Sequence, residues 1–136
     1  MPETYMLDTD VCNYIIKRRP AALKNTFLEH KSDTLCISVI TYAELLYGLE
    51  KNPSEKLERD LTEFASLVQV VDWNSATARK YAKIRHMMTK KGQIIGSLDM
   101  QIAAAALTVD AQLVTNNKKH FESIEGLKIA DWFLDV

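Results

Sequence analysis

The chain has 136 residues, 47% of them hydrophobic, and a formal net charge of −1. We expect a single domain over residues 1–136, and the composition excludes both wholesale disorder and a uniformly basic nucleic-acid coat. No segment reaches the roughly 18 apolar residues of a membrane helix, and the N-terminus lacks the pattern of a secretion signal. Two cysteines are too few for a disulfide scaffold, so we expect a cytoplasmic protein that does not bind membranes.

The first half of the chain alternates short apolar runs with helical patterns. Pro20 and Pro53 each suit the start of a helix, because proline tolerates the first helical turn. The expected elements, in chain order, are a strand at 5–7, helices at 11–16 and 20–30, a strand at 35–37, and helices at about 41–49 and 53–67.

The second half continues the alternation. The expected elements are a strand at 68–71, a long helix to about residue 91 capped by Asn74 or Ser75, a loop at 92–96, a helix at 98–109 capped by Ser97, a strand at 112–115, a turn at 116–121, and an edge strand at 127–129. Strands that alternate with helices predict an α/β fold, in which helices cover both faces of a mostly parallel sheet of four to five strands.

Three acidic residues stand where apolar strands give way to helices, namely Asp8, Glu44 and Asp99. Burying a carboxylate is costly, and gathering several in one place adds mutual repulsion. A hard cation such as Mg²⁺ or Mn²⁺ removes both costs, because it binds oxygen ligands. If the three meet at the carboxyl edge of the sheet, they predict a hydrolytic metal site.

Each acid also has a simpler interpretation as a helix-capping residue. Asp8 can cap the helix that follows it, Thr41 and Glu44 fit a capping box, and Asp99 in a first turn gains from the helix dipole. Capping alone does not require that all three lie at one edge of the sheet. This coincidence favours the metal site.

The segment Asp8-Thr9-Asp10 allows one further alternative. An Asp-x-Asp after a first strand also opens the haloacid dehalogenase phosphatases, in which the first Asp is a nucleophile. That mechanism gives Glu44 no role. It also needs a later lysine and a further acidic motif, and Lys118 and Asp99 fit these two roles poorly.

Five segments in order resemble the PIN-domain ribonucleases, and specifically the VapC-type toxins of bacterial toxin–antitoxin pairs. The segments are 6–10 (MLDTD), 38–48 (SVITYAELLYG), 94–103 (IIGSLDMQIA), 113–117 (LVTNN) and 131–132 (DW). The resemblance implies a PIN-like α/β/α sandwich. Segments 94–103 and 113–117 are also similar to those of the subgroup that cleaves initiator tRNA.

By this resemblance, Asp8, Glu44 and Asp99 are the catalytic, metal-binding acids, with Mg²⁺ or Mn²⁺ as the cofactor. The site would be supported by the hydroxyls of Thr9 and Thr115 and by the side chains of Asp10 and Asn117. Asn117 stands where the family often has a fourth acid, and an amide adds no charge. We therefore expect one tightly held ion.

Three carboxylates around one divalent ion leave a negative site, so an RNA phosphate needs cations from elsewhere in the protein. We expect phosphate contacts from Arg85, whose guanidinium matches phosphate geometry, and from Lys118 and Lys119 after the fourth strand. For each of these cations, the alternative is a solvated surface charge.

The resemblance also implies partners. They are an RNA substrate, with tRNA favoured, a VapB-type antitoxin whose helix lies in an apolar groove, and a second copy of the chain in a homodimer. Candidate groove residues are Tyr14, Ile15, Tyr42, Leu46, Tyr47 and Leu49. The alternative to the toxin is a degenerate, non-catalytic PIN module that binds RNA or protein.

Overall fold

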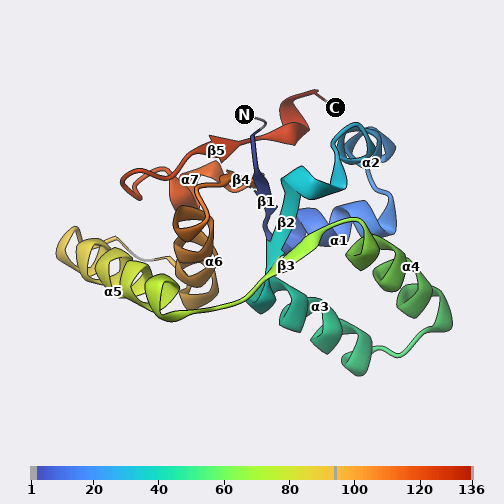
Figure 1. Cartoon of the computed structure of the whole chain (residues 1–136), viewed down its shortest axis with the longest axis horizontal. Coiled ribbons are helices and arrows are strands. Elements are labelled where there is room, and N and C mark those ends of the chain that lie inside the picture. Colours follow the sequence, from blue (N-terminus) through green and yellow to red (C-terminus); the bar gives the residue numbers. More distant parts are fainter. Residues whose placement is uncertain (1–2, 94, 136) are drawn as a thin grey trace.

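Five short strands form one parallel sheet in the computed structural model, which describes residues 3–93 and 95–135. The strands are β1 (Tyr5–Leu7), β2 (Leu35–Ser38), β3 (Gln69–Val71), β4 (Gln112–Val114) and β5 (Ile129–Ala130). Their order across the sheet is β3-β2-β1-β4-β5, and each neighbouring pair is parallel (Figure 1). The predicted α/β fold is confirmed, with β5 at an edge as expected.

Helices connect the strands. They are α1 (Thr9–Lys17), α2 (Ala21–Leu28), α3 (Val39–Lys51), α4 (Glu55–Ser66), α5 (Ser75–Lys90), α6 (Ser97–Thr108) and the short α7 (Lys118–Phe121), with 3-10 turns at Ser32–Thr34 and Trp132–Asp135. None of the helices in the described part of the chain combines the length and the apolar run needed to cross a bilayer.

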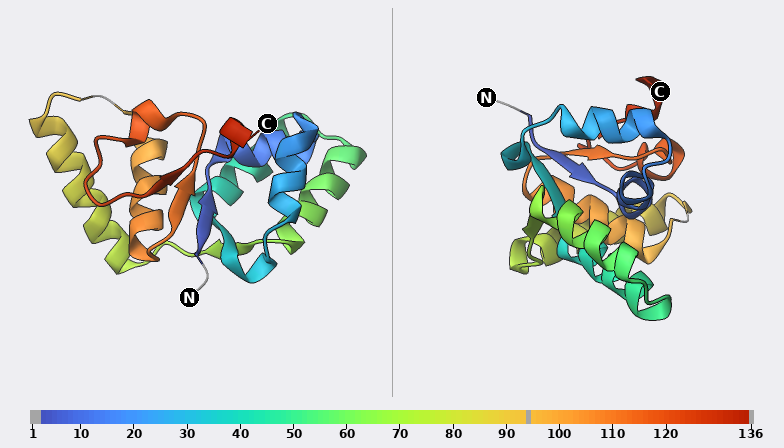
Figure 2. Two further views of the ribbon diagram at one scale, coloured as in Figure 1. Left: turned by 90° about the horizontal axis from the view of Figure 1, so that it is seen from above. Right: turned by 90° about the vertical axis from the view of Figure 1, so that its right-hand side faces the viewer.

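Alternate residues of the central strands face two separate hydrophobic cores, as the two-residue period of a strand requires. Leu7 and Val114 pack with apolar residues of α1, α2, α3 and α4. Their neighbours Met6 and Leu113 pack with α5, α6 and α7 on the other face. The sheet is therefore the middle of three layers, with the two groups of helices on its opposite sides (Figures 1 and 2).

Several helix boundaries differ from the sequence prediction. Helix α3 begins at Val39 rather than near Thr41, because the Ser38 hydroxyl at the end of β2 accepts a hydrogen bond from the Ile40 amide at 3.1 Å and caps the helix without a loop. Helix α6 is preceded by Gly96 rather than by a Ser97 cap. The predicted turn at 116–121 contains α7. The Asn74 cap of α5 is confirmed, and Thr77 completes a capping box with it.

A substitution in the α1–α4 core tests this packing. Phe64 of α4 stacks on Phe27 of α2 with ring centroids 5.5 Å apart, and each ring is 1% exposed. We expect Phe64→Ala to lower the free energy of unfolding by about 3–5 kcal/mol, because the truncation leaves a cavity. Urea unfolding measures the change. Leu28→Ala is the control, since Leu28 is 56% exposed and should cost less than about 0.5 kcal/mol.

Candidate active site

The carboxyl ends of β1 and β4 lie side by side at the middle of the sheet. The strand register pairs Leu7 with Val114, and the amide of Asp8 donates to the Val114 carbonyl at 3.1 Å. Asp8 and Thr115 are therefore neighbours just beyond the strands. The chain runs outward from β1 to β2 and β3, and then returns across β1 to β4. Such a reversal of strand order is where open α/β sheets bind ligands.

Asp8 is a buried carboxylate at this reversal point, with only 5% of the residue exposed. Its side chain accepts a hydrogen bond from the Val11 amide at 2.8 Å and caps α1. Burial is the main reason why its pKa is raised to about 6, and the charges of Asp10 and Asp99 raise it further. Hydrogen bonds from Thr115 and Val11 oppose the rise in this pKa. Asp8 therefore both caps α1 and lies among the acidic side chains of the site.

The supporting residues predicted from the sequence gather around Asp8. Asp10 lies in the first turn of α1, and its carboxylate accepts a hydrogen bond from the Asn117 side-chain amide at 3.4 Å. The backbone amide of Asn117 donates to the Thr115 hydroxyl at 3.0 Å. Thr115 is fully buried, so these bonds fix the residues that follow β4 against the start of α1.

Asp99 approaches the site from α6. It lies in the first turn of that helix, and its charge is among those that raise the pKa of Asp8. His120 of α7 lies beside it, with Nδ1 3.1 Å from the Asp99 carboxylate oxygen Oδ2. Sequence reasoning missed His120. These residues are 21 positions apart in the chain, and His120 stands in a segment predicted to be a turn, so no periodic pattern pointed to this contact.

Glu44 is not a capping residue of its helix. It follows β2 in α3, but the earlier start of that helix puts Glu44 beyond the first turn, so the capping box with Thr41 is absent. Thr41 is buried and accepts a hydrogen bond from the Thr9 hydroxyl at 3.2 Å, which ties α3 to α1 at the site. One turn later, Glu44 lines a hollow between α1, α3 and α4 together with Asn13 and Lys17.

The described residues, 3–93 and 95–135, contain no group of three His, Cys, Asp or Glu side chains placed to hold a metal ion. Closure of Asp8, Glu44 and Asp99 around one ion therefore stays a prediction. The donor chemistry nevertheless fits a hard cation. Mg²⁺ is commonly held by one or two carboxylates with water in its other positions. A cation would also offset the repulsion between Asp8 and its acidic neighbours.

The predicted RNA-contacting cations lie on two helices near the site. Lys118 and Lys119 are exposed on α7, directly after the Asn117 segment. Arg85 lies on the exposed face of α5 rather than inward, because Ile84 and Met88 fill the buried face. It lines a surface hollow with Trp73 and Tyr81. Their contact with an RNA phosphate stays a prediction.

Comparison with known proteins agrees with this architecture. A family model described as "PIN domain" matches residues 5–127. The tRNA(fMet)-specific endonuclease VapC of Shigella flexneri is 37% identical over 131 residues, which cover 94% of this chain and 97% of that protein. Ribonuclease VapC2 of Rickettsia felis is 38% identical over 130 residues, with the same coverage of both chains.

Solved structures give the same result. A crystal structure of VapBC2 from Rickettsia felis bound to a promoter DNA fragment contains a chain with a TM-score of 0.87, 36% identity, and coverage of 95% of this chain and 98% of that chain. A chain of the DNA-bound VapBC of Salmonella typhimurium has a TM-score of 0.84 and 36% identity, and the match covers 96% of this chain and 99% of that chain. The chain belongs to the PIN-domain family, and within it to the VapC proteins. The haloacid dehalogenase alternative is therefore excluded.

The raised pKa of Asp8 predicts how stability depends on pH in metal-free protein. Folding makes protonation of Asp8 easier, so its contribution is full below pH 3.8 and is lost as the pH rises through about 6. Asp8→Asn keeps a cap acceptor and removes the charge. In EDTA at pH 7.5, we expect Asp8→Asn to be more stable than wild type by up to about 3 kcal/mol, at about 1.4 kcal/mol per pKa unit.

Urea unfolding at pH 7.5 and pH 3.5 checks this expectation. The advantage of Asp8→Asn should disappear at pH 3.5, where wild-type Asp8 is protonated in both states. An offset of equal size at the two pH values would show that the substitution acts through packing instead of charge.

Proposed function

We propose that the protein is an endoribonuclease toxin that depends on a divalent cation, Mg²⁺ or Mn²⁺, and hydrolyses phosphodiester bonds of structured RNA. The observation that carries the proposal is the buried Asp8 carboxylate, with the charges of Asp99 and Asp10 beside it, at the strand-order reversal. A folded chain keeps such a set at the cost of burial and repulsion, which a cation relieves. Membership of the VapC proteins, several of which are named ribonucleases, agrees with it.

The residues of the chain divide the work between holding the cation and holding the RNA. Asp8 and Asp99 would bind the ion, with Asp10 and Asn117 in contact with its water, and Glu44 would act from α3 through water. A bound divalent cation polarises the phosphate and lowers the pKa of a bound water molecule. Asp8 keeps its orientation through the bonds from Val11 and Thr115.

The positive charge that attracts RNA is concentrated on α5. From Trp73 to Leu98 the sequence has six basic residues and no acidic ones, although the whole chain has a net charge of −1. The six are Arg79, Lys80, Lys83, Arg85, Lys90 and Lys91. Helix α5 packs against α6, which carries Asp99, and the C-terminal end of α5 lies toward the end of the molecule where β1 ends (Figure 2). Phosphates drawn to α5 are therefore held near the acidic site.

The substrate follows from the relatives. The VapC of Shigella flexneri is named as specific for tRNA(fMet), and so is that of Salmonella typhimurium. We infer that tRNA, and initiator tRNA in particular, is the substrate of this chain too. The Val114-Thr115-Asn116-Asn117 segment that suggested this subgroup is the segment that borders Asp8 and Asp10 in the structure.

We also infer a VapB-type antitoxin as the partner, because the similar solved structures from Rickettsia felis and Salmonella typhimurium are VapBC complexes. Three of the predicted groove residues are exposed, namely Tyr14, Leu46 and Tyr47, at 39%, 39% and 61%. They lie on α1 and α3, and other residues of these two helices line the hollow with Glu44. A basic antitoxin side chain in this hollow would meet the carboxylate of Glu44. Homodimerisation through α5 remains a further prediction.

A nuclease assay tests the proposal. Purified protein is incubated with total RNA and with initiator tRNA, in the presence of Mg²⁺, Mn²⁺ or EDTA. We expect discrete cleavage of the tRNA only with a divalent cation. The cleavage rate should fall on the order of 10²- to 10³-fold in Asp8→Asn and Asp99→Asn, because each change removes a charge that stabilises the transition state by several kcal/mol.

We expect Glu44→Gln to be less damaging, because we propose that Glu44 acts on the ion through water. Asp60→Asn on α4 is the control, as Asp60 is far from the site in the chain and is paired with Lys56. Wild-type protein that binds the tRNA but never cuts it would support the degenerate, non-catalytic module. Cleavage that survives both Asp8→Asn and Asp99→Asn would refute the assignment of these acids.

The role of α5 is tested through the salt dependence of RNA binding. We expect Arg85→Glu to weaken tRNA binding by catalytically inactive Asp99→Asn protein and to reduce the slope of log affinity against log salt by about 1. Arg59→Glu on the acidic helix α4 is the control, and should leave the slope unchanged. Light scattering of both variants separates an effect on RNA from an effect on a dimer through α5. An unchanged slope in Arg85→Glu would place the RNA elsewhere.

A further inference from the structure

The contact between His120 and Asp99 joins two short, well-anchored helical segments at the site. Asp99 is fixed by the first turn of α6, and His120 by α7, whose next residue Phe121 is 1% exposed in the core that α6 also builds. The backbone amide of His120 is itself bonded to the Asn117 carbonyl at 2.9 Å. Both backbones are thus held in place, and the side chains meet at the surface with Nδ1 and Oδ2 3.1 Å apart and His120 55% exposed.

The chemistry of the two side chains determines which atom donates the hydrogen bond and which atom accepts it. An ionised carboxylate has no proton to donate, so the hydrogen of this bond lies on Nδ1, and Oδ2 accepts it. The other carboxylate oxygen, Oδ1, is left free for a ligand. Without the bond, an Asp99 side chain that is 31% exposed could turn among several rotamers and hydrate both oxygens.

Among the described residues, no other side chain forms a hydrogen bond that would hold the Asp99 carboxylate in one orientation. Lys118 and Lys119 directly precede His120 in sequence but form no ion pair with Asp99 in the part of the chain that the structure describes. Hydrogen bonds to ligating carboxylates from outside the coordination shell orient them, and their removal commonly costs about 10- to 100-fold in metal affinity.

From this geometry we infer that His120 is a positioning residue, which holds the Asp99 carboxylate through Oδ2 so that Oδ1 faces the cation shared with Asp8. The inference rests on the proposed metal-dependent function. It assigns His120 no contact with RNA and no proton transfer.

Direct binding of Mn²⁺ tests the role without any RNA. Calorimetry, or the electron paramagnetic resonance signal of free Mn²⁺, gives the affinity of wild type and of three variants. We expect His120→Ala to bind Mn²⁺ about 10- to 100-fold more weakly. We expect His120→Asn to recover most of the affinity, because its side-chain N–H can occupy the place of Nδ1. His86→Ala, an exposed histidine of α5, should bind as wild type does.

Cleavage at increasing Mn²⁺ separates positioning from proton transfer. In His120→Ala the half-saturating Mn²⁺ concentration should rise, while the maximal rate at saturating Mn²⁺ stays within a few-fold of wild type. A maximal rate that stays low at saturation would overturn the positioning role, and so would wild-type or tighter Mn²⁺ binding by His120→Ala, which would mean that the imidazole competes with the cation. Circular dichroism and thermal unfolding confirm that the variants fold.

The two proposals fail in different ways. If wild type binds Mn²⁺, Asp99→Asn does not, and His120→Ala matches wild type, then only the inference on His120 is wrong. If wild type neither binds Mn²⁺ nor needs it to cleave RNA, then the proposed function itself is wrong.

Discussion

The burial of one carboxylate governs the chemistry of this protein. Asp8 sits at the tip of the central strand, where it is shielded from water and faces the charges of Asp10 and Asp99. Two hydrogen bonds, from Val11 and Thr115, offset part of that cost, and the raised pKa shows that they do not offset all of it. The remaining cost gives the folded protein an affinity for positive charge at this point, which either a proton or a metal ion can satisfy.

The parallel sheet explains why helix capping and a functional site occur together. Strands β1 and β2 pass directly into α1 and α3, with Asp8 and Ser38 as the caps, so no loop separates the strand tips from the helix starts. The first turns of α1 and α3 consequently meet beside the sheet edge, as the bond between Thr9 and Thr41 shows, and the charge of Asp99 in the first turn of α6 acts on Asp8 there. Residues that appear in the sequence as ordinary caps are then held in fixed positions, which a binding site requires.

Much of the fold could be predicted from the sequence, because it depends on local patterns. The apolar runs and helical periods gave the strands and their parallel arrangement, and Asp8, Asp10, Thr115 and Asn117 could be placed together because each borders a strand end. The place of Glu44 relative to the start of its helix was harder to predict. One serine decides where α3 begins, and a shift of two residues moves a side chain around the helix by more than half a turn. His120 lay beyond local patterns altogether, because α7 has only 4 residues and the partner of His120 comes from another helix.

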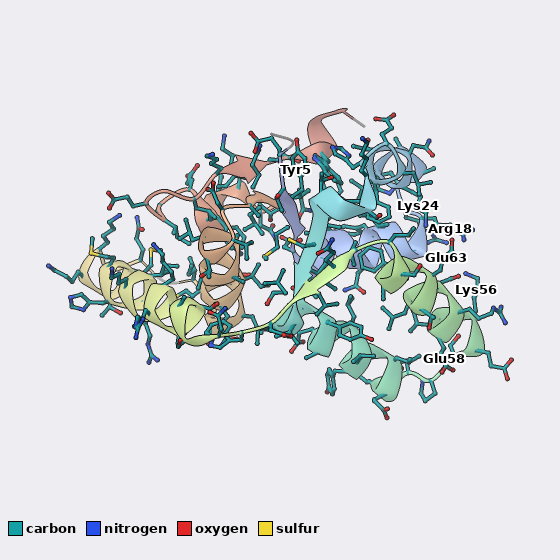
Figure 3. All side chains as sticks on the ribbon, in the orientation of Figure 1. Tyr5, Arg18, Lys24, Lys56, Glu58 and Glu63 are labelled. Atoms are coloured by element: carbon teal, nitrogen blue, oxygen red, sulfur yellow. The ribbon has the colours of Figure 1, made fainter. Side chains whose placement is uncertain are left out.

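The distribution of charge on the outer helices has a consequence of its own. The exposed surface of α4 carries Glu55, Glu58, Asp60 and Glu63 against two cations, and Lys56, Glu58 and Glu63 project from it at the end of the molecule away from α5 (Figure 3). The basic α5 lies at the other end, so these two outer helices carry opposite charge although the whole chain is nearly neutral (Figure 1). A polyanion attracts the basic helix and repels the acidic one, so an approach with α5 foremost is favoured. Orientation before contact shortens the search for a productive encounter, and this advantage appears in the association rate more than in the final affinity.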